Sequence, residues 1–89
     1  MQSAIYKIHL LREVGDVLMR LEARMFFDLA RDIDSLAFAP RREDAEELGE
    51  GFWLLRSRDF AIVYRIEDER LVVVLVRVGH QTEILAEPN

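Results

Sequence analysis

Residues 52–78 read FWLLRSRDFAIVYRIEDERLVVVLVRV, and this stretch decides the fold. It holds three runs that are rich in aromatic and β-branched residues: Phe52–Arg56, Phe60–Ile66 and Leu71–Val78. Such runs predict β-strands, and the polar segment Ile66–Arg70 between the last two predicts a hairpin turn. Because Leu71–Val76 is apolar at every position, we expect this strand in the middle of the sheet. The stretch therefore predicts three antiparallel strands.

The chain upstream of this meander predicts a strand followed by helix. Ser3–Leu10 alternates imperfectly between apolar and polar residues, as a first strand would. From Leu11 to Ala37 the apolar residues recur at three- and four-residue steps, which is typical of an amphipathic helix. A break near Leu21–Ala23 would make a helical hairpin, but neither glycine nor proline marks it, so a single bent helix is the alternative. Pro40 ends the helical region.

Two segments complete the predicted fold. Arg41–Glu47 is too polar for a core and is expected to be a solvated connector. Gly79 ends the last run, and Gln81–Leu85 is expected to form a short final strand. The prediction is a single α+β domain over residues 1–89, with an N-terminal strand, a helical hairpin and a three- to four-stranded antiparallel sheet. The helices would cover one face of this sheet and leave the other partly open.

The composition restricts the functions that are open to the chain. The 89 residues include no cysteine, which excludes disulfides and thiolate metal sites and suits a reducing cytoplasm. Neither a signal-peptide pattern nor an apolar run of about 20 residues is present, so we expect no membrane association. The net charge of −5 argues against nonspecific binding of nucleic acid. However, five arginines lie among residues 52–77, so a local basic patch is expected there.

Three segments carry a family resemblance. Gly51–Arg56, Asp59–Ile66 and Val76–His80 resemble, in order and spacing, the strands of the RelE/ParE toxin superfamily. The resemblance implies the toxin of a toxin–antitoxin module, neutralised by a cognate antitoxin. RelE-like members cleave mRNA on the ribosome, and ParE-like members inhibit DNA gyrase. We also expect that a domain this small associates with a partner or with itself as a homodimer.

The sequence departs from the family where the catalytic groups would stand. Ala61 occupies the position after the third-strand aromatic residue, where the family commonly has an arginine. Leu85 stands where a terminal tyrosine or another aromatic residue is often found. On the second strand, residues 53–55 are apolar, where RelE-like enzymes often carry lysine or arginine.

The polar residues that remain define a candidate site. His80 is the candidate catalytic residue, as the acid that protonates a leaving oxygen. The candidate RNA- or phosphate-binding residues are Arg56, Arg58, Arg65, Arg77 and Gln81. The alternative for the arginines is solvation of the sheet edge, and for His80 it is a hydrogen bond to a backbone group. No cofactor or metal is expected, and His9 has no partner in the pattern that would make it a metal ligand.

The large aromatic residues also have two interpretations. Phe52, Trp53 and Phe60 could stack on bases, but aromatic residues in strands beside helices are more often core, and we expect core.

Two functional hypotheses follow. The first is a RelE-like, mRNA-cleaving toxin or a weakened descendant of one, and the second is a noncatalytic protein of the same fold that acts by binding a protein. Convergence of Arg56, Arg58, Arg77 and His80 would favour RNA chemistry, and divergence would favour a binder.

Overall fold

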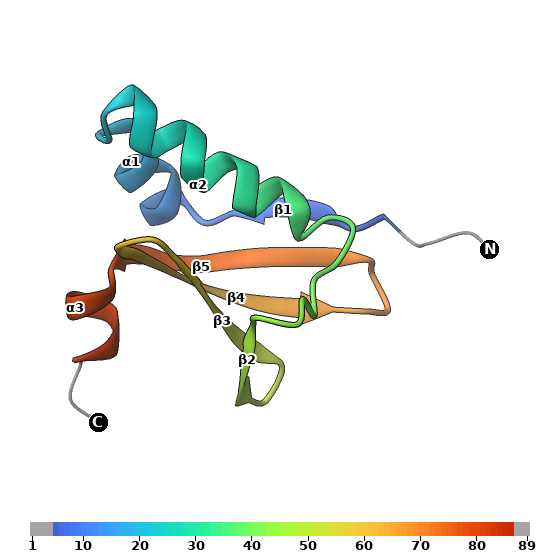
Figure 1. The fold of residues 1–89 in the computed structure, drawn as a ribbon. Coiled ribbons are helices and arrows are strands. Elements are labelled where there is room, and N and C mark those ends of the chain that lie inside the picture. The colour runs from blue at the N-terminus through green and yellow to red at the C-terminus, as the bar shows by residue number, and fades with distance from the viewer. Residues whose placement is uncertain (1–4, 87–89) are drawn as a thin grey trace.

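A five-stranded sheet forms the centre of the computed structural model, which describes residues 5–86 (Figure 1). The strands are β1 (Lys7–Leu10), β2 (Glu46–Gly49), β3 (Phe52–Ser57), β4 (Phe60–Glu67) and β5 (Val72–His80). Their order is β1-β5-β4-β3-β2; β2 to β5 are antiparallel, and β1 pairs in parallel with β5. The predicted α+β class is confirmed. β5 is an interior strand, although β4 rather than β5 is the middle one.

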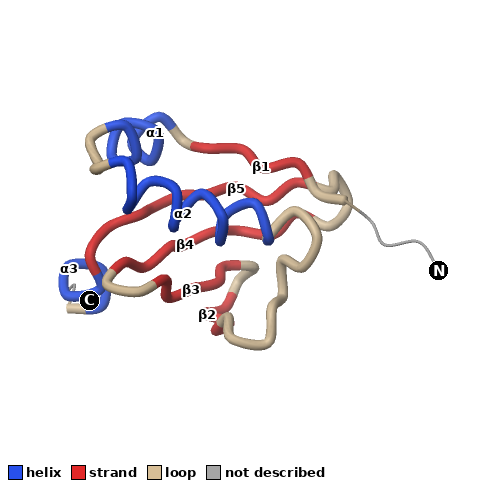
Figure 2. The backbone as a smooth tube through the Cα atoms, turned by 45° about the horizontal axis from the view of Figure 1, so that its top comes forward, coloured by secondary structure: helices blue, strands red, loops and turns tan. Residues whose placement is uncertain are grey.

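Two helices cover one face of the sheet (Figures 1 and 2). They are α1 (Arg12–Met19) and α2 (Ala23–Ser35), so the helical hairpin is confirmed and the single bent helix is not. The break needs neither glycine nor proline, because Arg20 stays in the helical region and Glu22 is extended, at φ −60° and ψ 153°. Glu22 thus begins a new helix in a new direction.

The core lies between this helical hairpin and the sheet. Val14 and Leu18 of α1 and Leu29 and Ile33 of α2 are almost fully buried. They pack against strand side chains on the covered face of the sheet: Leu55, Phe60, Ile62, Tyr64, Ile66, Val73, Leu75 and Val78. Burial of each large apolar side chain contributes about 1.5–3 kcal/mol, which makes this layer the main source of stability.

Polar contacts hold the connector between α2 and the sheet. The hydroxyl of the fully buried Tyr64 donates a hydrogen bond to the carbonyl of Pro40 at 2.6 Å, and burial raises the pKa of Tyr64 to about 12. Arg42 forms ion pairs with Asp32 at 3.1 Å and Asp44 at 2.6 Å. The prediction of a solvated connector is therefore wrong in part, since its start is fixed to the domain and its last two residues belong to β2.

The N-terminal segment is fastened to the β4–β5 turn. The predicted strand begins later than expected, at Lys7, and Ser3 and Ala4 lie outside the described residues. Just before β1, the Tyr6 hydroxyl donates to Asp68 at 2.6 Å, and Arg41 donates to both oxygens of the same carboxylate, at 3.0 and 2.6 Å. The Arg41 hydrogen bonds, followed by that of Tyr6, lower the pKa of Asp68 to about 2.

The C-terminal segment corrects a prediction. Gln81–Leu85 forms the short helix α3, not a strand. β5 continues through Gly79 to His80, and α3 then lies on the side of the sheet opposite α1 and α2 (Figure 1). Its Ile84 sits over Gly79, where an added Cβ would lie 3.2 Å from the Ile84 Cδ1 atom. Among residues 5–86, no helix is long and apolar enough to cross a membrane.

Candidate functional site

The sheet has one face covered by α1 and α2 and one face open. Successive side chains of a strand point to opposite faces. Residues that alternate with the core positions therefore lie on the open face, and the register aligns them in rows. One row holds Phe52, Arg65, Val74 and His9, the next holds Leu54, Val63 and Arg77, and the third holds Arg56, Ala61 and Gly79.

Three of the candidate arginines lie on this open face. Arg56 forms an ion pair with Glu46 of the neighbouring strand at 2.5 Å. The guanidinium carbon of Arg65 lies 5.5 Å from the centre of the Phe52 ring, within the range of a cation–π contact. Arg77 is exposed on β5. The open face thus keeps a basic character, although the Arg56 charge is partly offset by Glu46.

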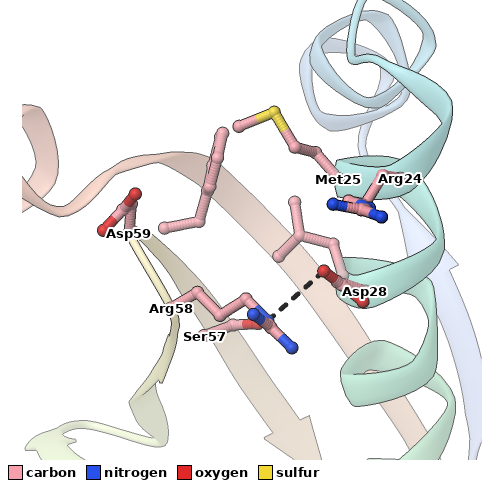
Figure 3. Close-up of a pocket in the computed structure, with 8 residues that line it drawn as sticks. Arg24, Met25, Asp28, Ser57, Arg58 and Asp59 are labelled. Carbon is pink, nitrogen blue, oxygen red and sulfur yellow. Dashed lines mark ion pairs between the residues drawn. The ribbon is translucent and has the colours of Figure 1, made fainter.

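The other three candidates lie elsewhere, near the turn between β3 and β4. His80 pairs with Phe60 on the covered face, and the two rings stack with centroids 4.5 Å apart at 28°. Arg58, in the turn at φ 57°, reaches toward α2 and forms an ion pair with Asp28 at 3.3 Å (Figure 3). The Gln81 side chain donates to the carbonyl of Arg58. These three groups are local neighbours of one another but not of Arg65 or Arg77.

The predicted site residues therefore separate into two groups, one on the open face of the sheet and one around the β3–β4 turn. Cleavage of RNA by attack of a 2′-OH needs proton removal, proton donation and stabilisation of phosphate charge around one phosphorus atom. His80 on the covered face and Arg56 or Arg77 on the open face do not face a common space. The arginines and His80 therefore diverge, which is the arrangement expected of a protein binder.

Ala61 stands at the position where the family resemblance implies an arginine, and α3 covers it. Ala61 is fully buried although it lies on the open face, between Arg56 and Gly79. Because neither Ala61 nor Gly79 has a long side chain, α3 can approach the sheet there and place Ile84 over Gly79. An added Cβ at Gly79 would also lie 3.3 Å from a carboxylate oxygen of Glu83. The place where the family resemblance implies a phosphate-binding cation is thus covered by Ile84 and Glu83 of α3.

An apolar groove continues from α3 along the open face. The side chains that line it come from β2, β3, β4, β5 and α3: Leu48, Leu54, Val63, Val76, Arg77, Ile84 and Leu85. Leu85 stands where the family resemblance placed a tyrosine, and it lies in this groove. Leu48 and Leu85 are about half exposed, at 53% and 46%. An apolar surface of this kind suits contact with a protein.

A second hollow lies between α2 and the β3–β4 turn. Met25, Leu29 and Phe60 form its apolar part, and polar side chains form its rim: Arg24, Asp28, Ser57, Arg58 and Asp59 (Figure 3). The Arg58–Asp28 ion pair crosses this rim. The rim holds two arginines and two aspartates, so its formal charges balance.

Some expectations about individual residues need correction, and some residues were missed. Trp53 and Phe60 belong to the core as expected, but Phe52 lies half-buried on the open face beside Arg65. His9 was not predicted to join other candidates, yet the parallel pairing of β1 with β5 places it in the same row as Arg65. The sequence holds no signal for that neighbourhood, because β1 and β4 are far apart in the chain.

Within residues 5–86, no three histidine, aspartate or glutamate side chains stand together in a way that could hold a metal ion.

A family comparison gives a match over most of the chain. The family model described as "ParE toxin of type II toxin-antitoxin system, parDE" matches residues 11–85. No curated protein matches significantly.

Solved structures of toxins share the fold. The toxin–antitoxin complex RelBE2 of Mycobacterium tuberculosis is similar with a TM-score of 0.76 and 25% identity, over 85% of this chain and 98% of that one. The isolated RelE toxin of E. coli is similar with a TM-score of 0.76 and 20% identity, over 91% of this chain and 92% of that one. The RelE–RelB complex of Pyrococcus horikoshii is similar with a TM-score of 0.69 and 19% identity, over 86% of this chain and 96% of that one.

Proposed function

The chain belongs to the ParE toxin family of type II toxin–antitoxin systems, and we propose that it is a noncatalytic toxin that acts by binding a protein target. The observation that carries the proposal is the state of the open face. Ala61 is buried there under α3, and His80 stacks on Phe60 on the opposite face. A surface without an acid and a base at one point supports binding better than bond cleavage. DNA gyrase, the target implied by the resemblance to ParE-like toxins, is the first target to test.

A cognate antitoxin is the partner that we infer for this toxin. Two of the similar structures, those of M. tuberculosis and P. horikoshii, are toxin–antitoxin complexes. Exposed apolar side chains on the helical hairpin are consistent with a protein partner, because Met19 is 84% exposed and Phe27 is 67% exposed.

The second candidate function is cleavage of mRNA. It is favoured by the three arginines on the open face, Arg56, Arg65 and Arg77, and by the shared fold with RelE toxins. In that function the arginines would hold phosphate and the ribosome would supply much of the substrate alignment. His80 would have to leave Phe60 and act from the other side of the sheet.

The deciding experiment is induced expression of the chain in bacteria, with growth and the 5′ ends of cellular mRNA followed together. We expect growth arrest without new codon-spaced 5′ ends, and inhibition of gyrase supercoiling by the purified protein. Arrest accompanied by such ends would overturn the proposal in favour of mRNA cleavage. Absence of arrest would refute toxicity in either form.

Two variants sharpen this experiment. His80→Ala is expected to leave growth arrest unchanged. If His80 were the general acid of a nuclease, its removal would lower the cleavage rate by about 10²-fold or more. Leu55→Asp is the negative control, because it puts a charge at a position with no exposed surface and prevents folding. Arrest by this variant would mean that the effect does not come from the folded domain.

A further inference from the structure

We propose that the open face of the sheet binds a short extended segment of a partner protein, with apolar side chains in the groove and acidic side chains at its basic end. The inference rests on the proposed function, because it assumes that the partner is a protein. It adds the chemical nature of the bound segment and the part of the sheet that binds it.

The apolar half of this surface is the groove between α3 and the strands. Its walls come from five elements: Leu48 and Leu85 are about half exposed, Val63, Val76 and Ile84 are partly buried, and Leu54 is buried at its base. α3 has no fully buried residue, so its Ile84 and Leu85 present apolar surface to this groove as well as to the sheet.

The basic half adjoins the groove, and we call it the basic corner: Lys7, His9, Arg65 and Arg77, which surround Val74 on the open face. Arg65 and His9 occupy the positions on either side of Val74, on the strands that flank β5. Arg77 also lines the apolar groove, so the two halves are continuous. All four side chains are exposed.

Acidic residues limit the size of the ligand that this corner can accept. Glu67 is on the same face but pairs with Arg70 at 2.8 Å, and Glu46 pairs with Arg56 at 2.5 Å. Glu50 and Glu69 line a hollow beside Arg65 at the edge of the face. A long polyanion such as RNA would cross these carboxylates, on a chain whose net charge is −5. A few acidic side chains next to apolar ones fit the surface better.

The dimensions of the sheet set the length of the segment. The surface extends from β3 across β4 and β5 to β1. Three strand spacings of about 4.8 Å give roughly 14 Å, and an extended chain rises about 3.3 Å per residue. About four to six residues would therefore reach from the groove to the basic corner. Electrostatic complementarity at that end would fix the direction of the segment.

The test is fluorescence anisotropy with the purified chain and a labelled nine-residue probe peptide, in which three leucines alternate with serines and three glutamates follow. We expect binding that weakens as salt rises, because the charged contacts are exposed. Reversal of two charges in Arg65→Glu/Arg77→Glu should weaken binding by about tenfold or more. A probe with lysines in place of the glutamates should then bind this variant better than the wild type. A purely structural role of the arginines would not reverse the preference.

Controls separate the two halves of the surface and the two proposals. Arg20→Glu/Arg31→Glu, an equal charge change at two exposed positions of the helical hairpin, should leave binding unchanged. A probe with serines in place of leucines should lose binding; unchanged binding would refute the role of the groove. Tighter binding of a twelve-nucleotide oligouridylate than of the peptide, or no binding of the peptide, would overturn this inference. Neither result would by itself overturn the proposed function, whose test is arrest without mRNA cleavage.

Discussion

Removal of one buried hydroxyl should measure how firmly the connector is held to the sheet. Tyr64 is fully buried, and its hydroxyl donates to the carbonyl of Pro40 at 2.6 Å. Pro40 is itself buried, so Tyr64→Phe would leave its carbonyl without this donor while hardly changing the volume of the core. A buried carbonyl that loses its hydrogen bond costs about 1–3 kcal/mol. This is a large fraction of the stability of a small domain.

The assay is urea unfolding followed by the fluorescence of the single tryptophan, Trp53. This residue packs against the core, and the Arg41 guanidinium lies 5.9 Å from its ring centre, so its signal reports on the connector as well as on the sheet. For a slope of about 1 kcal/mol per M, a loss of about 2 kcal/mol lowers the midpoint by about 2 M.

The chain offers a matched control, because it has two tyrosines. The Tyr6 hydroxyl donates to Asp68 at an exposed site, where water can replace it, so Tyr6→Phe should cost about 1 kcal/mol or less. The reasoning is refuted if Tyr64→Phe is as stable as the wild type, or if the two variants lose the same amount of stability.

Two further predictions follow from the same contacts. The folded pKa of Asp68, about 2, lies below its usual value of about 3.9, so its contribution to the free energy of unfolding is complete above about pH 4 and is lost as the pH falls through 2. Asp68→Asn should therefore lower the urea midpoint at pH 7, with a difference from the wild type that shrinks between pH 4 and 2; a constant difference would contradict the assignment. Ala61→Arg should cost about 1–3 kcal/mol and accelerate proteolysis near residue 85, because the side chain displaces α3. It should produce no mRNA cleavage, and primer extension that detects new 5′ ends would refute the separation of His80 from the open face.

The elements with a strong period were predictable, and those without one were not. The helical hairpin and the last three strands follow from apolar spacing, because burial of one face depends on spacing alone. β2 has four exposed residues and no alternation, and it exists because it pairs with β3 through a turn in which Gly49, Glu50 and Gly51 all have positive φ, at 106°, 56° and 86°. Such a strand is set by its neighbour and not by its own sequence.

The last segment was mispredicted because five residues cannot distinguish a helix from a strand. Ile84 and Leu85 are apolar in either structure. The outcome depends on Gly79, where the lack of a side chain leaves space for Ile84. Contacts between residues brought together by folding decided this element.

The faces on which the site residues lie depend on one extra residue in β5. Strict alternation from the buried Leu75 would turn Arg77 toward the helices and His80 toward the open face. The register, however, pairs Tyr64 with Leu75 and the preceding Val63 with Arg77, so Val76 is an additional residue in a β-bulge. The bulge moves Arg77 to the open face and His80 to the covered face. The sequence VVVLVRVGH contains no mark of the bulge, so alternation alone would assign Arg77 and His80 to the wrong faces.

Ala61, Gly79 and α3 together shape the open face beside the apolar groove. A long cation in place of Ala61 would stand beside Gly79, in the space that Ile84 now occupies. Without that cation, α3 packs on the sheet and adds Ile84 and Leu85 to the groove. Under the proposed function, alanine in place of the arginine that the family resemblance implies would also allow this apolar surface to form on the same face. A long cation at residue 61 and the Ile84 side chain of this groove would compete for the same space, which is why Ala61→Arg tests both interpretations of the face.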